Sequence, residues 1–106
     1  MFFKKFDKDM SEVKQAMQQG TKIQLVDVRF EEEYIEGHIP NAILIPLPQL
    51  EELADTLLNK DSTTYVYCRS GQRASKAVMK LKAMGYHEVF NVGGVIHWSY
   101  PLEKGR

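Results

Sequence analysis

Apolar residues along the chain follow two spacings, one typical of helices and one typical of buried strands. Short apolar runs rich in β-branched or aromatic residues predict strands at Ile23–Val28, Ile43–Ile45, Thr63–Tyr67 and Val89–Val92. Helical spacing or an acidic first turn predicts helices at Met10–Met17, Phe30–Glu36, Leu50–Leu58 and Ala74–Leu81. Strands therefore alternate with helices, which indicates an α/β fold with a mostly parallel central sheet and helices on both faces.

The length of the chain fits one domain. A single core usually takes roughly 100–150 residues, and no internal repeat, low-complexity tract or linker interrupts the 106 residues. We therefore expect residues 1–106 to form a single domain. With one cysteine the chain cannot form an internal disulfide, which excludes a disulfide-stapled secreted scaffold.

Charge and hydropathy limit the partners. Fourteen basic residues balance fourteen acidic ones, so the net charge suggests neither a nucleic acid nor an anionic membrane as partner. The segment Met1–Asp7 is interrupted by charge within four residues, unlike a signal peptide. No apolar run approaches the roughly 20 residues that a membrane span needs. We expect a soluble cytoplasmic domain with no nucleic-acid or membrane partner.

Cys68 stands at the carboxyl end of a predicted strand, where ligands gather in parallel sheets. A lone cysteine after an apolar strand is usually a small buried hydrophobe. Here, however, it is followed by Arg69-Ser70-Gly71-Gln72-Arg73 and then by a helix. Inward backbone N–H groups and a helix N-terminus in such a loop would bind negative charge, so we expect the thiol to ionise easily. The loop is not a P-loop, because no Gly-Lys-Ser/Thr follows the glycine.

Several short motifs resemble the rhodanese family. They are Asp27-Val28-Arg29, Glu33-Tyr34, Gly37-His38-Ile39-Pro40-Asn41-Ala42, Ile45-Pro46, Tyr67 to Ser75, Met84-Gly85-Tyr86, and Asn91-Val92-Gly93-Gly94 with Trp98. The resemblance runs from about Gln24 to Trp98, and it implies a single-domain rhodanese-like fold. It also implies a thiosulfate sulfurtransferase that works through a persulfide on Cys68. Two-domain members surround this loop with residues of a second domain, which we do not expect here.

The resemblance also suggests roles for the residues around Cys68. Arg69 and Arg73 would attract an anionic donor, with Arg73 also bracing the loop from its helical end. The alternative for both is an exposed solubilising charge. The amides of Ser70, Gly71 and Gln72 would face the bound sulfur.

Three polar residues upstream are candidates for supporting roles. Asp27 and Arg29 end a predicted strand at the same sheet edge as Cys68, and they could form a pair that supports the loop. His38 lies in a turn-like Gly-His-Ile-Pro; we expect a structural hydrogen bond rather than a cysteine–histidine dyad. His87 and His97 fit no metal spacing, so neither a metal nor a cofactor is expected.

Three functions compete. The first is a sulfurtransferase that takes sulfur from a small-molecule donor such as thiosulfate and passes it to a thiol, to cyanide or to a sulfur-accepting protein. The second is a cysteine-based phosphatase or arsenate reductase of the same fold. The third is a sulfur-relay or docking module for a partner protein. Four residues separate Cys68 from Arg73, whereas the phosphatase type has five, and the shorter loop favours a single sulfur atom over a phosphoryl group.

Overall fold

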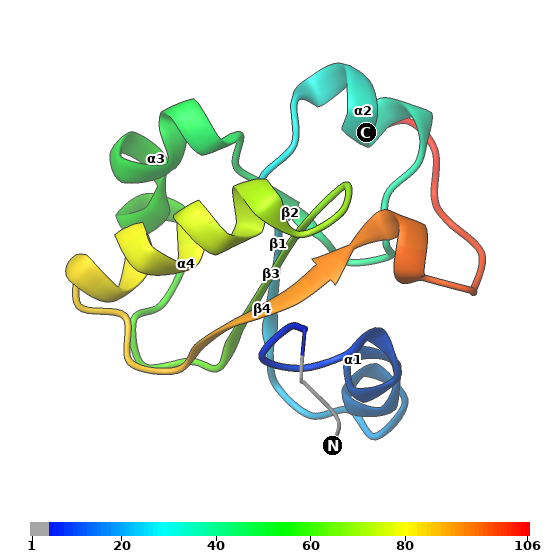
Figure 1. Ribbon diagram of the computed structural model, residues 1–106, viewed down its shortest axis with the longest axis horizontal. Helices are drawn as coiled ribbons and strands as arrows, with labels where there is room; N and C mark the ends of the chain where they lie inside the picture. The colour runs from blue at the N-terminus through cyan, green and yellow to red at the C-terminus, as the bar shows by residue number, and fades with distance from the viewer. Residues whose placement is uncertain (1–4) are drawn as a thin grey trace.

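The computed structural model describes residues 5–106. Residues 1–4, part of the segment for which no signal peptide is expected, lie outside this range. Four strands form one sheet in the order β2-β1-β3-β4: β1 (Gln24–Asp27), β2 (Ile43–Leu44), β3 (Thr64–Cys68) and β4 (Val89–Gly94). Each neighbouring pair runs parallel (Figure 1). The expectation of a mostly parallel sheet is confirmed.

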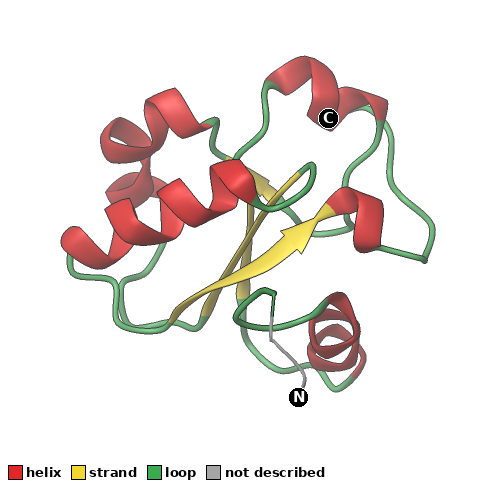
Figure 2. Cartoon of the chain, viewed as in Figure 1, coloured by secondary structure: helices red, strands yellow, loops and turns green. Residues whose placement is uncertain are grey.

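Helices alternate with the strands as predicted (Figure 2). They are α1 (Met10–Gln18), α2 (Glu31–Glu36), α3 (Leu50–Leu57) and α4 (Gln72–Ala83), with short 3₁₀ turns η1 (Leu47–Gln49) and η2 (Val95–His97). Local capping fixes two of the starts, since the Asp9 carboxylate accepts from the Glu12 N–H and the Glu33 carboxylate from the Phe30 N–H. Across residues 5–106, no helix is both long and apolar enough to cross a membrane.

The bounds differ from the predicted ones by a few residues. β2 ends at Leu44, one residue early, just before Ile45 and Pro46. The regular ladder ends there because Pro46 has no N–H to donate and the N–H of Arg29 donates to the Asp27 carboxylate. One further backbone bond follows, from the N–H of Leu47 to the carbonyl of Val28. β4 runs two residues further than predicted, to Gly94, because that residue pairs with Cys68 of β3. The helix expected from Ala74 already begins at Gln72.

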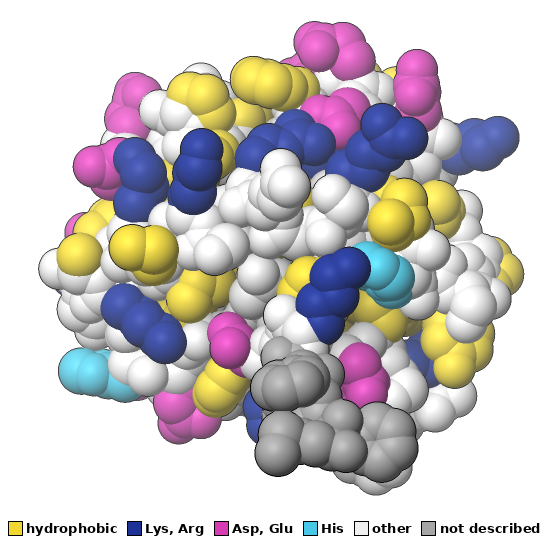
Figure 3. Space-filling model, viewed as in Figure 1, with side chains coloured by type: hydrophobic (Ala, Val, Ile, Leu, Met, Phe, Trp, Pro, Cys, Tyr) yellow, Lys and Arg dark blue, Asp and Glu magenta, His cyan; other side chains and the backbone are white. Residues whose placement is uncertain are grey.

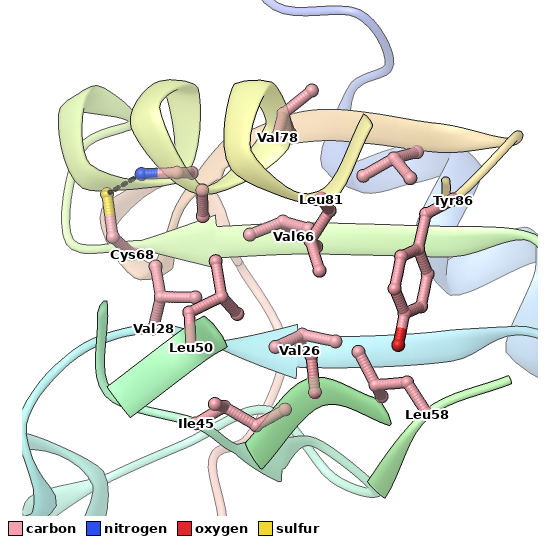
Figure 4. Close-up of a cluster of buried hydrophobic side chains, with 14 residues drawn as sticks. Val26, Val28, Ile45, Leu50, Leu58, Val66, Cys68, Val78, Leu81 and Tyr86 are labelled. Carbon is pink, nitrogen blue, oxygen red and sulfur yellow. Dashed lines mark hydrogen bonds between the residues drawn. The ribbon is translucent and has the colours of Figure 1, made fainter. Parts of the chain in front are cut away.

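Side chains alternate across the sheet and form two buried clusters. On one face, Val26 of β1 and Val66 of β3 pack with residues of α3 and α4 (Figure 4). On the other face, Leu25 and Tyr65 pack with residues of α1. Helices therefore cover both faces, as predicted; the central strands β1 and β3 are largely buried, while the edge strand β2 is only partly buried.

The parallel arrangement brings the carboxyl ends of three strands to one edge. Asp27, the last residue of β1, is in register with Tyr67, and Cys68 is in register with Gly94 of β4. The register shifts between Val66 and Cys68, where β3 leaves the regular ladder. This edge is where β3 turns into the loop that leads to α4 (Figure 1).

Candidate active site

Cys68 ends β3 with its side chain at the margin of the buried cluster (Figure 4). The residue is only 1% exposed. Its sulfur accepts two backbone hydrogen bonds, from the N–H of Gly71 at 3.0 Å and from the N–H of Ala74 at 3.4 Å. Backbone donors that converge on one atom form a site for negative charge at the end of β3.

The geometry of this cradle comes from a tight turn into α4. Gly71 immediately precedes the helix with φ +108°, a left-handed conformation that side chains rarely adopt. The turn directs the N–H of Gly71 back to the sulfur. Ala74 lies in the first turn of the twelve-residue helix α4, where N–H groups have no partner within the helix. The positive end of the helix dipole adds to the attraction for an anion.

The last residue of β4 lies directly against the start of the loop. A Cβ atom placed on Gly94 would lie 1.8 Å from the carbonyl oxygen of Arg69. The same carbonyl accepts a hydrogen bond from the N–H of Ile96 at 3.3 Å. Only a glycine therefore allows β4 to approach the loop this closely, and β4 and η2 together hold the loop's first peptide group in place.

Arg73 is held by an acidic residue of α2. Its guanidinium donates to both carboxylate oxygens of Glu33, at 2.8 and 3.0 Å. The hydrogen bond from Arg73 lowers the pKa of Glu33 to about 2, and the same bond raises the pKa of Arg73. Basic and acidic side chains are interspersed on this part of the surface (Figure 3). The pair ties the first turn of α4 to α2.

The other polar residues of the loop face solvent. Arg69, Ser70 and Gln72 are exposed. Within residues 5–106, no acidic side chain lies at ion-pair distance from Arg69. Arg69 and Arg29 line a cavity of about 480 Å³ beside the loop, together with Glu33 and Glu36. Arg69 is thus exposed to solvent, whereas the charge of Arg73 is shared with the carboxylate of Glu33.

Asp27 and Arg29 form a buried ion pair at the end of β1. Their closest atoms are 2.7 Å apart, and both side chains are almost completely buried. Burial by itself lowers the pKa of Arg29, but the hydrogen bonds and charge of Asp27 outweigh it, so the pKa is raised. Arg29 also donates to the carbonyl of Gly37 at 2.8 Å. The pair therefore joins the end of β1 to the chain that follows α2, beside the loop rather than in contact with the sulfur.

His38 is bound within its own segment. Its Nδ1 donates to the carbonyl of Tyr34 at 2.8 Å, and its ring stacks on that of Tyr34 at 3.7 Å between centroids. Its backbone pairs with Glu103 near the C-terminal end of the sequence. These contacts correspond to a structural hydrogen bond, the alternative we expected, rather than to a dyad with Cys68.

Sequence reasoning missed three residues that contact the loop or its helix. Glu33 and Asn91 lie inside motifs that carry the rhodanese resemblance, but nothing local assigns them a role. Asn91 donates from its side chain to the carbonyl of Gly71 at 3.1 Å. Phe6 packs on Gly71 from the segment before α1. These contacts join residues 40, 20 and 65 positions apart in the sequence, so no local pattern could have revealed them.

Comparison with known proteins identifies the family of the chain. A family model described as the rhodanese-like domain matches residues 9–100. The chain belongs to the rhodanese-like family. The rhodanese-like fold expected from the sequence is thereby confirmed, and the family is one of sulfurtransferases.

Individual rhodanese-like relatives give the same result. Thiosulfate sulfurtransferase PspE of Escherichia coli is 38% identical over 81 residues, which is 76% of this chain and 78% of that protein. The adenylyltransferase and sulfurtransferase uba4 of Ogataea parapolymorpha is 40% identical over 80 residues, 74% of this chain but only 21% of that protein. A crystal structure of a rhodanese-like domain protein from Staphylococcus aureus superposes with a TM-score of 0.83 at 34% identity, covering 93% of this chain and 97% of the other.

Proposed function

We propose that this rhodanese-like domain transfers a sulfane sulfur from thiosulfate, or a similar anionic donor, to a thiol acceptor through a persulfide on Cys68. The observation that carries the proposal is the convergence of the Gly71 and Ala74 amides on the sulfur of Cys68. Amides that converge on the sulfur of Cys68 stabilise negative charge on the thiolate that would attack the donor and that would be restored when the acceptor takes the sulfur.

The chemistry has two steps. The thiolate of Cys68 attacks the outer sulfur of thiosulfate; a new S–S bond forms, and the S–S bond of thiosulfate breaks as sulfite leaves with the electron pair. An acceptor nucleophile then attacks the terminal sulfur of the persulfide, and the electron pair of that S–S bond returns to Cys68 as thiolate. No general base is needed for the first attack if the thiol is already ionised.

The side chains around the cradle take different parts in this proposal. Arg69, which is exposed and has no acidic partner among residues 5–106, would attract the anionic donor. Arg73 would contribute its positive charge to the site while its pairing with Glu33 braces α4. Ser70 and Gln72 would contribute backbone amides, and the buried pair Asp27–Arg29 would stiffen the sheet edge.

The short loop argues against a phosphatase. A phosphoryl group presents three equatorial oxygens, each of which needs donors from the loop and from a bidentate arginine. Here two amides lie within hydrogen-bond distance of the cysteine sulfur itself. The guanidinium of Arg73 already binds the carboxylate of Glu33 with both of its terminal nitrogens. These features favour a single sulfur atom over a phosphate transition state.

The acceptor is a thiol in this proposal, either a small molecule or a protein. The protein alternative is supported by the relative uba4, whose name combines a sulfurtransferase with an adenylyltransferase in one chain. In that version the domain serves as a relay that receives and passes on sulfur.

Mass spectrometry of the intact protein tests the mechanism. Incubation with thiosulfate should add one sulfur atom, and later addition of cyanide should remove it. Cys68→Ser should gain no sulfur, because Cys68 is the only thiol in the chain. The same preparation should be assayed for hydrolysis of an aryl phosphate. A protein that hydrolyses the phosphate ester through Cys68 and gains no sulfur would overturn the proposal in favour of a phosphatase.

A further inference from the structure

The segment before α1 runs alongside β4 and is tied to it by the backbone. The N–H groups of Asp7 and Lys8 both donate to the carbonyl of Asn91, at 2.9 and 3.3 Å. In return, the N–H of Asn91 donates to the Asp7 carboxylate at 2.8 Å. These bonds fix the position of Phe6, which precedes the residues matched by the family model.

The ring of Phe6 lies against two glycines of the site. A Cβ atom added to Gly71 would lie 2.4 Å from the ring, and one added to Gly93 would lie 2.9 Å from it. The ring of His97 in η2 lies next to it, with 5.3 Å between centroids. The aromatic ring therefore fills the space beside Gly71 that a side chain would otherwise occupy.

Asn91 holds the peptide groups of the same two glycines. Its side-chain nitrogen donates to the carbonyl of Gly71 at 3.1 Å, and its side-chain oxygen accepts from the N–H of Gly93 at 2.8 Å. This pairing fixes which end of the amide faces the loop. Gly71 is thus held at its carbonyl by Asn91 and by the N–H of Ser75 at 3.0 Å, and at its α-carbon by Phe6, while its N–H donates to the sulfur of Cys68.

We propose that Phe6 and Asn91 are positioning residues that keep the N–H of Gly71 directed at the sulfur of Cys68. A glycine at φ +108° has no side chain of its own to restrict rotation, so the neighbours must supply that restriction. The proposal deepens the proposed sulfur transfer, on which its kinetic part rests. It assigns a role in that transfer to a segment outside the matched rhodanese-like region.

The first test replaces Phe6. Complete loss of one preorganised donor to a developing anion costs about 10²–10³ in rate, so a loosened donor in Phe6→Ala should slow persulfide formation from thiosulfate about tenfold. Hydrogen exchange of the Gly71 amide, followed by NMR, should become about tenfold faster because local opening is easier. Phe6→Leu keeps an apolar side chain of similar reach and should recover most of both losses.

Phe90→Ala is the matched control. Phe90 is a partly buried aromatic residue of the same strand as Asn91; its ring packs on Tyr65 and under the ammonium of Lys8, whereas the side chain nearest the α-carbon of Gly71 is that of Phe6. In this variant the rate of persulfide formation and the hydrogen-exchange rate of the Gly71 amide should stay within about twofold of the rates in the protein without substitutions. An equal loss in Phe90→Ala, or unchanged exchange of Gly71 in Phe6→Ala, would overturn the proposal.

The second test changes one atom of Asn91. Asn91→Asp keeps an oxygen that accepts from Gly93 but replaces the donor to the Gly71 carbonyl with a second acceptor. It should accelerate exchange of the Gly71 amide and slow persulfide formation, each by about tenfold or more. Unchanged exchange of Gly71 in Asn91→Asp would also refute the proposal. If the protein without substitutions takes no sulfur from thiosulfate, the proposed function fails. The hydrogen-exchange measurements on Gly71 still decide whether Phe6 and Asn91 position its N–H.

Discussion

Neutralising Glu33 offers a quantitative test of the brace between α2 and α4. Glu33→Gln removes the charge while keeping the shape of the side chain. It leaves the guanidinium of Arg73 with at most one neutral acceptor in place of two charged ones at 2.8 and 3.0 Å. The folded protein should therefore lose stability at neutral pH.

The magnitude follows from the pKa of Glu33, which is lowered from 4.5 to about 2, chiefly by the hydrogen bond from Arg73. Each pKa unit corresponds to about 1.4 kcal/mol, so the full shift sets an upper bound of about 3 kcal/mol. The side chains of Arg73 and Glu33 are 30% and 31% exposed. Because solvent screens such a pair, we expect about 1 kcal/mol, or about 4–8 °C in Tm.

The pH dependence gives a sharper signature. A carboxyl group with a lowered pKa in the folded state contributes its full stability above its unfolded pKa. That contribution is lost as the pH falls from 4.5 through the folded value of about 2. The difference in unfolding free energy between the two proteins, measured by urea denaturation, should be constant near neutral pH and should shrink steadily below pH 4.5.

Glu32→Gln is the control, since it removes the same charge from the neighbouring position of α2, where the side chain is exposed. It should change the unfolding free energy by less than about 0.5 kcal/mol. The reasoning would be refuted if both variants lost equal stability. It would also be refuted if the stability lost in Glu33→Gln were as large well below pH 4.5 as at neutral pH.

Two further variants test the rest of the sheet edge. Gly94→Ala places a methyl group 1.8 Å from the carbonyl of Arg69, the first of the loop. It should lower the unfolding free energy by about 1–3 kcal/mol and slow sulfur transfer. In the control Gly20→Ala no atom lies within 4 Å of the added group, so sulfur transfer should be unchanged. Arg29→Met leaves the Asp27 charge buried and unpaired, and it should lower the unfolding free energy measured by urea denaturation by about 3–5 kcal/mol. Lys80→Met, which breaks an exposed pair, should lower it by less than about 1 kcal/mol. A small loss in Arg29→Met would show that the buried pair is not required.

The sequence by itself determined the order of the elements and the place of Cys68 among them. Hydrophobic spacing is a local property, and burial on one or both faces imposes it directly on each segment. The run Thr64–Cys68 is apolar because β3 is buried on both sides, and that burial places Cys68 at a strand end. The alternation of elements then implied a parallel sheet, and so a site at its carboxyl edge.

The tertiary structure decided which side chains hold that site. Four glutamates lie between positions 31 and 36, and no spacing rule selects Glu33 as the partner of Arg73. The strand order and the packing of α2 beside α4 make that selection. In the same way, β4 must lie next to β3 before Asn91 can reach Gly71. The segment before α1 must in turn pair with β4 before Phe6 can contact Gly71. Side-chain partners distant in sequence depend on where whole elements pack, and that packing is settled by the buried surface of the complete chain rather than by any one segment.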